Sequence, residues 1–381
     1  MVKVFPKVTK MKSQLRVGFI IYGGLDSCSG GYLYDRKILE GLRKLGADVE
    51  VLSLPLRNYG LHLTDNFSAA LFRILNRQKW DILIQDELCH PSLIRLNACL
   101  HKTAPYPILS IVHHLRCCEK HPGYLQNVYR HVEKRYLQTV DGLILNSRTT
   151  ECAVQECLKR SLPAVVAYPG RDHLSPQTTK DKIAVRCKIT GPLRLLFLGN
   201  VIRRKGLHVL LQALEQLPYT GWQLTIAGDH SPQPRYTKRI FSETRKQGWH
   251  HSIRFAGYVA HAEMASLLES HHVLVMPSQY EGFGIAALDA MGFGMPVIAS
   301  TTGAMPEWIT NGVEGFLMLP DAPSHWASRI KDLMDNRTRL LEMSTAAIQK
   351  YAQHPTWDEA AGRVFDFIQD MIAYSAISDK K

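Results

Sequence analysis

Residues 278–300 read SQYEGFGIAALDAMGFGMPVIAS and carry a glycine-rich loop, a helix and a strand in close succession. The apolar run VLVMPS (273–278) leads into the loop, IAALDAMG has helical composition, and PVIAS (296–300) is the next apolar run. Short apolar runs that alternate with helices and are bounded by glycines are typical of buried parallel strands. This stretch therefore predicts a parallel α/β sheet.

Two acids, Glu281 and Asp289, lie in this apolar stretch, where a carboxylate needs a partner. Gly282 and Gly284 allow a ligand to approach the backbone, and the following helix offers the positive end of its dipole. Asp289 comes two helical turns later on roughly the same face. The two acids could bind hydroxyls on two parts of one long ligand. Taken separately, each acid is better explained by a structural role. Glu281 would be a carboxylate at a helix N-terminus, and Asp289 would be a partly buried residue that caps a loop.

The same alternation of apolar runs and helices extends through most of the chain. The expected strands of the second half are LRLLFLGN (193–200), WQLTIAGD (222–229), IRFAGYV (253–259), VLVMPS and PVIAS. Those of the first half are LRVGFIIYGG (15–24), ADVEVLSLP (47–55), DILIQDE (81–87), PILSIVHH (107–114), GLILNS (142–147) and AVVAYPG (164–170). A helix over 32–46 follows the first strand. Two doubly wound, Rossmann-like domains are the fold class that this order predicts.

The polar segment 171–192 has weak periodicity and two prolines, so we place the domain boundary there. The predicted parts are an N-terminal tail (1–14), an N-terminal Rossmann-like domain (15–175), a linker (176–192), a C-terminal Rossmann-like domain (193–352) and a C-terminal helix and tail (353–381). The first 14 residues are basic but lack the apolar region of a secretory signal.

The composition is ordinary for a globular protein, with 45% hydrophobic and 21% charged residues among 381. No apolar run approaches the roughly 20 residues that a membrane helix needs. The eight cysteines show no zinc-ligand spacing, which favours a reducing, cytoplasmic location. The net charge of +12 favours anionic partners, but no nucleic-acid-binding module is present.

A basic turn, GNVIRRKG (199–206), stands where a strand ends and a helix begins. Backbone N–H groups at a helix start, together with Arg and Lys, suit a diphosphate. A solvated basic turn is an equally good interpretation of this motif alone. The spacing of a P-loop is absent.

In combination, these motifs resemble family 4 of the GT-B glycosyltransferases. The similarity runs in the right order through 193–320 and includes FAGYV (255–259) and NGVEGFL (311–317). The N-terminal half is similar mainly through its glycine-rich first turn. The segment WDEAA (357–361) resembles the helix that crosses back to the N-terminal domain. The resemblance implies two Rossmann-like domains that face across a cleft. The N-terminal domain (15–175) would bind the acceptor, the C-terminal domain (193–352) would bind the nucleotide-sugar donor, and the last segment (353–381) would carry the crossover helix.

The resemblance also implies roles for individual residues. Arg203 and Lys205 would hold the donor diphosphate, with Arg204 as an alternative to Arg203. Glu281 would bind hydroxyls of the transferred sugar. Asp289 stands where the family has a ribose-binding Glu and is one methylene shorter, which puts its ribose contact in doubt. The other implied donor contacts are Ser29, Gly30 and Gly31 (or Gly23 and Gly24), Gly199, Gly282, Phe283, Gly284 and Ile285.

His113 and His114 end a predicted strand where family members often carry His-Asp. By this resemblance His113 would contact the transferred sugar near its anomeric carbon, and His114 replaces the Asp. Adjacent strand residues point to opposite faces, so we expect only one of the two to reach a ligand. His114, Asp86 and Glu87 are candidates for acceptor binding, with structural capping as the alternative for the two acids.

A retaining transfer of a hexose from a nucleotide diphosphate sugar to a hydroxyl acceptor is the implied reaction, without a cofactor or metal. The acceptor could be a glycan, a lipid or a small metabolite. Alternatives are a sugar phosphorylase, a nucleotide-sugar epimerase or a non-catalytic sugar-nucleotide binder.

The segment YLQNVYRHVEKRYLQ (124–138) combines an apolar helical stripe with basic residues. We favour a core-facing helix with a solvated basic face. The more specific hypothesis is that this segment binds anionic lipid, so that the protein lies peripherally on the cytoplasmic face of a membrane.

Overall fold

The computed structural model describes residues 14–27 and 29–378. The predicted N-terminal tail lies outside this range except for its last residue. The chain divides into two compact units, which are described separately. One unit takes the residues up to Gly170 together with those from Pro355 onward, and the other takes Arg171–His354.

The first unit is built on a six-stranded parallel sheet with the order β2-β1-β3-β4-β5-β6. Its strands are β1 (Arg16–Tyr22), β2 (Asp48–Leu54), β3 (Ile82–Asp86), β4 (Ile108–Val112), β5 (Gly142–Leu145) and β6 (Ala164–Val166). Strands β3, β4 and β5 are buried along their whole length, as their continuous apolar runs predicted.

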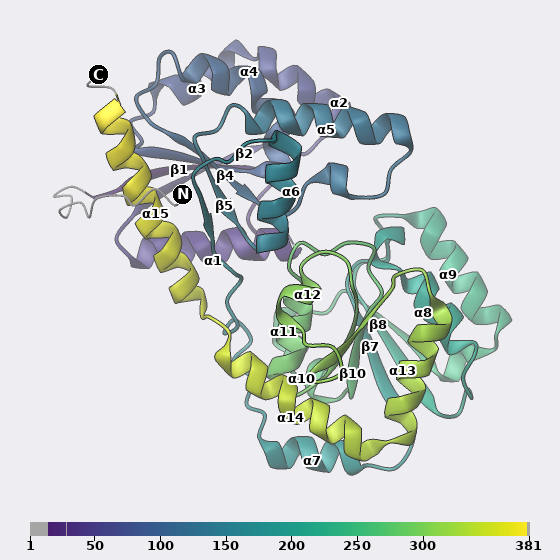
Figure 1. Ribbon diagram of the computed structural model, residues 1–381. Helices are drawn as coiled ribbons and strands as arrows, with labels where there is room; N and C mark the ends of the chain where they lie inside the picture. The colour runs from purple at the N-terminus through teal and green to yellow at the C-terminus, as the bar shows by residue number, and fades with distance from the viewer. Residues whose placement is uncertain (1–13, 28, 379–381) are drawn as a thin grey trace. The chain divides into compact units, whose positions relative to one another are not determined.

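Helices connect and cover these strands (Figure 1). They are α1 (Gly30–Lys44), α2 (Tyr59–His62), α3 (Ala69–Arg77), α4 (His90–Leu100), α5 (Gly123–Leu137), α6 (Arg148–Leu158) and α15 (Trp357–Ser378). Short 3₁₀ turns are η1 (Leu63–Phe67), η2 (Glu87–Cys89) and η3 (Arg116–Cys118). The predicted first helix begins two residues earlier than expected, because Gly30 and Gly31 form its first turn.

Helix α5 lies where the sequence predicted an amphipathic helix. Tyr136 and Leu137 are buried, whereas Arg130 and Arg135 are exposed to solvent. Its apolar stripe is incomplete, because Val128 is 48% exposed. Among the described residues, no helix is both long and apolar enough to cross a bilayer.

Helix α15 returns to the first unit and packs against α1, which it crosses (Figure 1). A Cβ on Gly41 would lie only 2.2 Å from the Cβ of Ala361, so the two helices approach more closely than larger residues would allow. Trp357 packs on Gly170, and its ring lies 5.8 Å from that of Tyr34. The small residues and the tryptophan of WDEAA therefore fix where the last helix docks.

The second unit contains another six-stranded parallel sheet, with the order β12-β11-β10-β7-β8-β9. Its strands are β7 (Leu193–Leu198), β8 (Trp222–Ala227), β9 (Ile253–Gly257), β10 (Val273–Met276), β11 (Val297–Ser300) and β12 (Gly315–Met318). Its helices are α7 (Lys180–Lys188), α8 (Leu207–Leu214), α9 (Pro234–Lys246), α10 (His261–Glu269), α11 (Ile285–Gly292), α12 (Met305–Trp308), α13 (Pro323–Asp335) and α14 (Arg337–Gln353), with 3₁₀ turns η4 (Arg203–Lys205) and η5 (Trp249–His251).

The segment expected to be a linker (176–192) instead contains α7, which belongs to the second unit. Ile183 and Cys187 are buried in the core of that unit. The guanidinium of Arg186 is also buried and donates hydrogen bonds to the carbonyl oxygens of Phe293 and Gly294, at 2.8 and 2.7 Å. The sequence did not predict this helix. Arginine usually indicates a solvent-exposed position, whereas Arg186 is buried and donates to carbonyl groups.

The contact between α1 and α15 leads to a test of stability. Gly41→Ala should lower the free energy of unfolding by about 1–3 kcal/mol, because the new methyl group has no room against Ala361. Gly362→Ala in α15 is the matched control, since a Cβ there meets nothing within 4 Å and helix propensity favours Ala by about 1 kcal/mol. Urea unfolding measures both. Equal stability of Gly41→Ala and wild type would contradict the close contact.

Candidate functional site

Two loops of the second unit meet at the carboxyl ends of β7 and β10. The first loop turns through Gly199 and Gly206, which have φ angles of 147° and 72°. A Cβ on Gly206 would lie 1.9 Å from the carbonyl oxygen of Pro277, at the start of the second loop. Only glycine therefore allows the basic turn to pack against the loop that contains Glu281.

Lys205 and Glu281 form an ion pair in which Lys205 Nζ lies 2.6 Å from Glu281 Oε1. Both side chains are largely shielded from solvent, at 19% and 11% exposure. Burial alone would raise the pKa of Glu281, but the positive charges of Lys205 and Arg204 hold it below its ordinary value. Glu281 is therefore a carboxylate at neutral pH.

The two arginines of the basic turn, Arg203 and Arg204, differ in their contacts. Arg204 donates from its guanidinium to the carbonyl oxygen of Tyr280 at 2.8 Å, so it braces the second loop. Arg203 uses its backbone N–H for a hydrogen bond to Gln233 Oε1, at 2.9 Å, and its side chain is exposed. Arg203 is thus better placed than Arg204 to bind an external anion.

The backbone at the start of α11 is tightly constrained. Gly284 has a φ angle of 95°, and a Cβ there would lie 1.9 Å from Met305 Cε. The ring of Phe283 is buried and stacks on Trp308, with ring centroids 5.2 Å apart. Of the predicted donor contacts at this loop, Phe283 can therefore offer its backbone but not its ring.

Asp289 lies in α11 and is 7% exposed. Burial raises its pKa well above the ordinary value. Asp289 Oδ2 lies 3.4 Å from His173 Nε2, while its Oδ1 has no hydrogen-bond partner among the described residues. A buried acid with one oxygen unsatisfied by the protein suits a ligand hydroxyl. His173 was not predicted as a site residue, because it lies after strand β6 in the polar segment where we placed the domain boundary.

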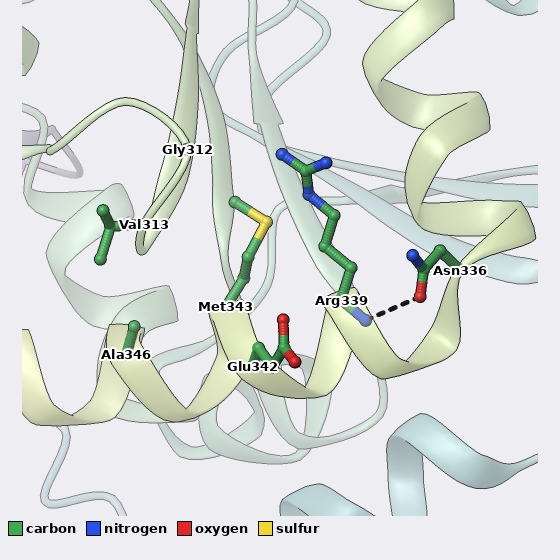
Figure 2. Close-up of a pocket in the computed structure, with 7 residues that line it drawn as sticks. All are labelled: Gly312, Val313, Asn336, Arg339, Glu342, Met343 and Ala346. Atoms are coloured by element: carbon green, nitrogen blue, oxygen red, sulfur yellow. Dashed lines mark hydrogen bonds between the residues drawn. The ribbon is translucent and has the colours of Figure 1, made fainter.

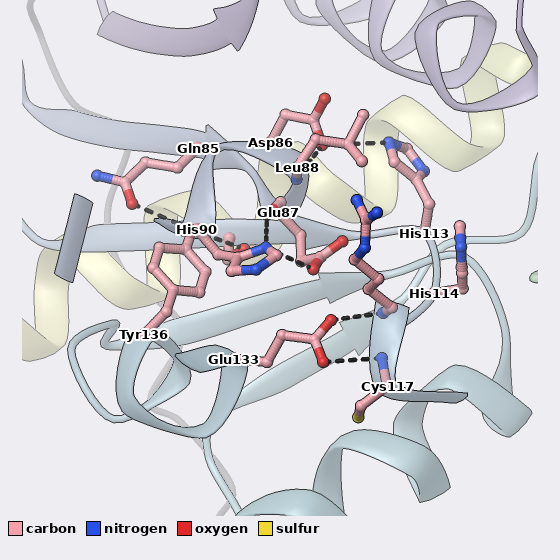
Figure 3. Close-up of polar contacts among 12 residues, drawn as sticks. Gln85, Asp86, Glu87, Leu88, His90, His113, His114, Cys117, Glu133 and Tyr136 are labelled. Atoms are coloured by element: carbon pink, nitrogen blue, oxygen red, sulfur yellow. Dashed lines mark hydrogen bonds and ion pairs between the residues drawn. The ribbon is translucent and has the colours of Figure 1, made fainter. Parts of the chain in front are cut away.

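His113 follows strand β4 of the first unit and is buried beside two carboxyl groups, of which Figure 3 labels that of Asp86. Its Nε2 lies 3.1 Å from Asp35 Oδ1 and 3.9 Å from Asp86 Oδ1. Burial alone would lower the pKa of His113, but Asp35 and Asp86 raise it to about 9. Gly31 leaves room for the ring, since a Cβ there would lie 3.2 Å from it. Ser29 precedes α1 without making a side-chain cap.

The tentative acceptor residues have partners within the first unit. Asp86 Oδ1 accepts a hydrogen bond from the Leu88 N–H at 3.0 Å, and Glu87 Oε1 lies 3.1 Å from His90 Nδ1. The Asp86 contact matches the capping alternative, whereas Glu87 Oε1 has no hydrogen-bond partner among the described residues. His114 Nε2 lies 2.9 Å from Glu119 Oε1, and the histidine side chain is 24% exposed.

Two groups of buried donors in the first unit lie close enough to share a cation. They are Asp35, Asp86 and His113, and Glu87, His90 and Glu133. In each group a histidine nitrogen already lies 3.1 Å from a carboxylate oxygen. A protonated imidazole supplies the positive charge that these carboxylates need, so we interpret both groups as proton-sharing sites.

A cavity on the second unit lies at the start of α14 (Figure 2). It is lined by Gly312, Val313, Asn336, Arg339, Glu342, Met343 and Ala346. Asn336 Oδ1 accepts from the Arg339 N–H at 2.9 Å, which caps the helix. None of the site residues predicted from the sequence lines this cavity.

The basic turn and the Glu281 loop lie in a part of the chain that matches a known family model. Residues 179–352 match the family model described as Glycosyl transferases group 1. The chain is 28% identical to a glycogen synthase of Mycobacterium tuberculosis over 262 residues, which cover 67% of this chain and 61% of that protein. It is 27% identical to a D-inositol 3-phosphate glycosyltransferase of Corynebacterium diphtheriae, over 61% of this chain and 56% of that one. The chain thus spans less than two thirds of the length of these curated relatives.

Solved structures share the fold over most of the chain. A sucrose-phosphate synthase from Thermosynechococcus elongatus has a TM-score of 0.82 at 19% identity, covering 95% of this chain and 100% of that chain. HepE of Anabaena, solved with UDP and glucose, has a TM-score of 0.76 at 17% identity, covering 93% and 100%. The prediction of a GT-B fold with two Rossmann-like units is confirmed.

The Lys205–Glu281 pair should contribute to stability in a pH-dependent way. Lys205→Ala should lower the free energy of unfolding at pH 7 by about 2 kcal/mol or more, because it leaves a shielded carboxylate unpaired. The pKa of Glu281 is lowered in the folded state, so this contribution is present above its unfolded pKa of about 4.3 and is lost at lower pH. Urea unfolding at pH 7 and pH 3.5 measures the difference.

The matched control is Lys331→Ala, which removes an exposed ion pair with Asp335 and should change stability by less than about 0.5 kcal/mol. Equal losses for the two lysine variants would contradict the special position of Lys205.

Asp35→Asn should shift the titration of His113. The pKa of His113 is raised to about 9, so its stabilising contribution is complete below its unfolded pKa of about 6.5 and is lost as the pH rises through 9. Removal of the Asp35 charge should lower the pKa of His113 by about one unit or more. Histidine NMR titration measures it, and Glu119→Gln, beside His114, is the control that should leave His113 unchanged.

Proposed function

We propose that this protein is a retaining, metal-independent glycosyltransferase that moves a hexose from a nucleotide diphosphate sugar to a hydroxyl acceptor. The observation that carries the proposal is the direct contact between Lys205 and Glu281, which joins the two glycine-bounded loops of the second unit. The matched family model includes both loops. A cation beside a carboxylate at the ends of parallel strands suits a ligand with both phosphates and hydroxyls.

A nucleoside diphosphate is the proposed donor group. HepE of Anabaena was solved with UDP and with UDP-glucose, and several similar proteins are named as glycosyltransferases or synthases. These names support a nucleotide-sugar donor, with UDP-glucose as the first compound to test.

Each donor contact has a proposed role. Arg203 and Lys205 would bind the diphosphate, Glu281 would accept hydrogen bonds from sugar hydroxyls, and the backbone N–H groups at the start of α11 would face the leaving group. Asp289 would accept a hydrogen bond from a ribose hydroxyl through its unsatisfied Oδ1. Because Glu281 is held as a carboxylate by Lys205, it is an acceptor for hydroxyls throughout the neutral pH range.

The proposed chemistry depends on charge stabilisation rather than on a protein nucleophile. The bond from the anomeric carbon to the diphosphate oxygen breaks, the acceptor hydroxyl oxygen forms a new bond on the same face, and the hydroxyl proton passes to the departing diphosphate. Negative charge then develops on the leaving diphosphate, where Arg203, Lys205 and the helix start would stabilise it. His113, as an imidazolium, would donate a hydrogen bond to the transferred sugar. We further propose a cytoplasmic location, with at most peripheral contact to a membrane.

A donor panel tests this proposal. UDP-, GDP- and ADP-sugars are screened by thermal shift, since a ligand that binds only the folded state raises the melting temperature. Binding donors are then incubated with hydroxyl acceptors, and release of nucleoside diphosphate is measured with and without EDTA. We expect at least one donor to bind and turn over, unaffected by EDTA.

Lys205→Ala and Glu281→Ala should reduce turnover at least a hundredfold, whereas the control Lys331→Ala should retain it. Full activity of both site variants would refute the site assignment. Dependence on inorganic phosphate would identify a phosphorylase, and tight donor binding without turnover or hydrolysis would identify a sugar-nucleotide binder.

A further inference from the structure

Arg116 occupies an unusual position in the first unit. It begins η3, three residues after His113, just beyond the carboxyl end of β4. The guanidinium carbon lies 4.6 Å from the ring centroid of Tyr129 and 5.0 Å from that of Tyr59. The residue is exposed to solvent, and among the described residues its guanidinium has no ion pair or hydrogen bond.

The surroundings of Arg116 fix it in place. Its backbone N–H and that of Cys117 donate to the two carboxylate oxygens of Glu133, which is fully buried. Figure 3 shows Glu133 beside Cys117 and His90 in this part of the unit. The Tyr59 hydroxyl lies 2.8 Å from His90 Nε2, so this ring is tied to the buried polar group of Glu87 and His90.

The geometry of stacking determines which part of the guanidinium remains available. An aromatic ring attracts a cation through the face of the ring, and the two tyrosines hold Arg116 in this way. The five N–H donors of a guanidinium lie in its plane and form a fork that matches an oxyanion. A cation that is held rigidly while its donors remain unused loses little conformational entropy when a ligand binds.

We propose that Arg116 binds a phosphate group of the acceptor. This rests on the proposed function and on the expectation from the sequence that the N-terminal domain binds the acceptor. A phosphate monoester carries nearly two negative charges at neutral pH, and it offers three acceptor oxygens to the guanidinium fork. The acceptor class is then a hydroxyl compound that carries a phosphate, either a small sugar or cyclitol phosphate or the headgroup of a phospholipid.

Binding without a donor tests the site directly. The full chain is titrated calorimetrically with fructose 6-phosphate and fructose, and with myo-inositol 1-phosphate and myo-inositol. We expect at least one phosphorylated probe to bind about tenfold or more tightly than its parent compound. Arg116→Gln should abolish this preference, and Arg116→Lys should retain part of it because the charge remains without the fork.

Arg135→Gln is the matched control, because Arg135 is an exposed arginine of α5 without a ring contact among the described residues. It should keep the full preference. Tyr129→Leu should weaken the preference, whereas Tyr129→Phe should preserve it, since only the ring face holds the guanidinium.

Vesicles distinguish the two sources of phosphate. Flotation with phosphatidylinositol vesicles, compared with phosphatidylcholine vesicles, should depend on Arg116 if the acceptor is a lipid. Absence of a phosphate preference in both formats, or a preference that survives Arg116→Gln, would overturn the proposal. Nucleotide binding by the second unit, measured in parallel, separates this result from the proposed function: a wild-type chain that prefers phosphate but never transfers sugar would retain the site and lose the reaction.

Discussion

The 2.6 Å contact between Lys205 and Glu281 is the interaction on which the second unit's site depends. Burial would raise the pKa of Glu281, but the positive charge of Lys205 lowers it and keeps the side chain ionised. The contact also joins loops that follow two different strands of one sheet. The glycines around it serve the same contact. Gly206 admits the carbonyl group of Pro277, and a Cβ on Gly303 would lie 2.0 Å from the backbone oxygen of Glu281. The glycines let the two loops approach each other, and the ion pair between Lys205 and Glu281 then holds them together.

The first unit solves a different electrostatic problem. Its buried carboxyl groups outnumber their histidine partners near the ends of β3 and β4, and burial raises the pKa of Asp86 well above its ordinary value and that of Glu133 to about 7. Protons and backbone N–H groups, rather than lysine or arginine side chains, balance the charge there. Such a cluster costs stability relative to an apolar core of the same volume, which is typical of residues retained for their chemistry.

The sequence predicted features that are local in the chain. Apolar runs identified eleven of the twelve strands described here, and the glycine-bounded motifs around Lys205 and Glu281 identified the loops of the second unit. Strand β12 (Gly315–Met318) was not predicted, because its segment was interpreted only as part of the turn motif NGVEGFL. The sequence also did not predict partners that are distant along the chain. Asp35 reaches His113 across 78 positions, and His173 reaches Asp289 only after the unit has folded. Helix α7 was missed because Arg186 is buried against carbonyl groups, and Arg116 because its tyrosines come from α2 and α5.

The docking of α15 on α1 has a consequence for the order of folding during synthesis. The second unit is continuous in sequence, so every strand and helix of it is synthesised before α15. The first unit is discontinuous, and the small residues that receive α15 stay uncovered until α15 itself has been synthesised. The sheet of the first unit is thus translated before the second unit, whereas the helix that packs on α1 is added after it. During that interval the apolar face of α1 is the surface that a chaperone would have reason to protect.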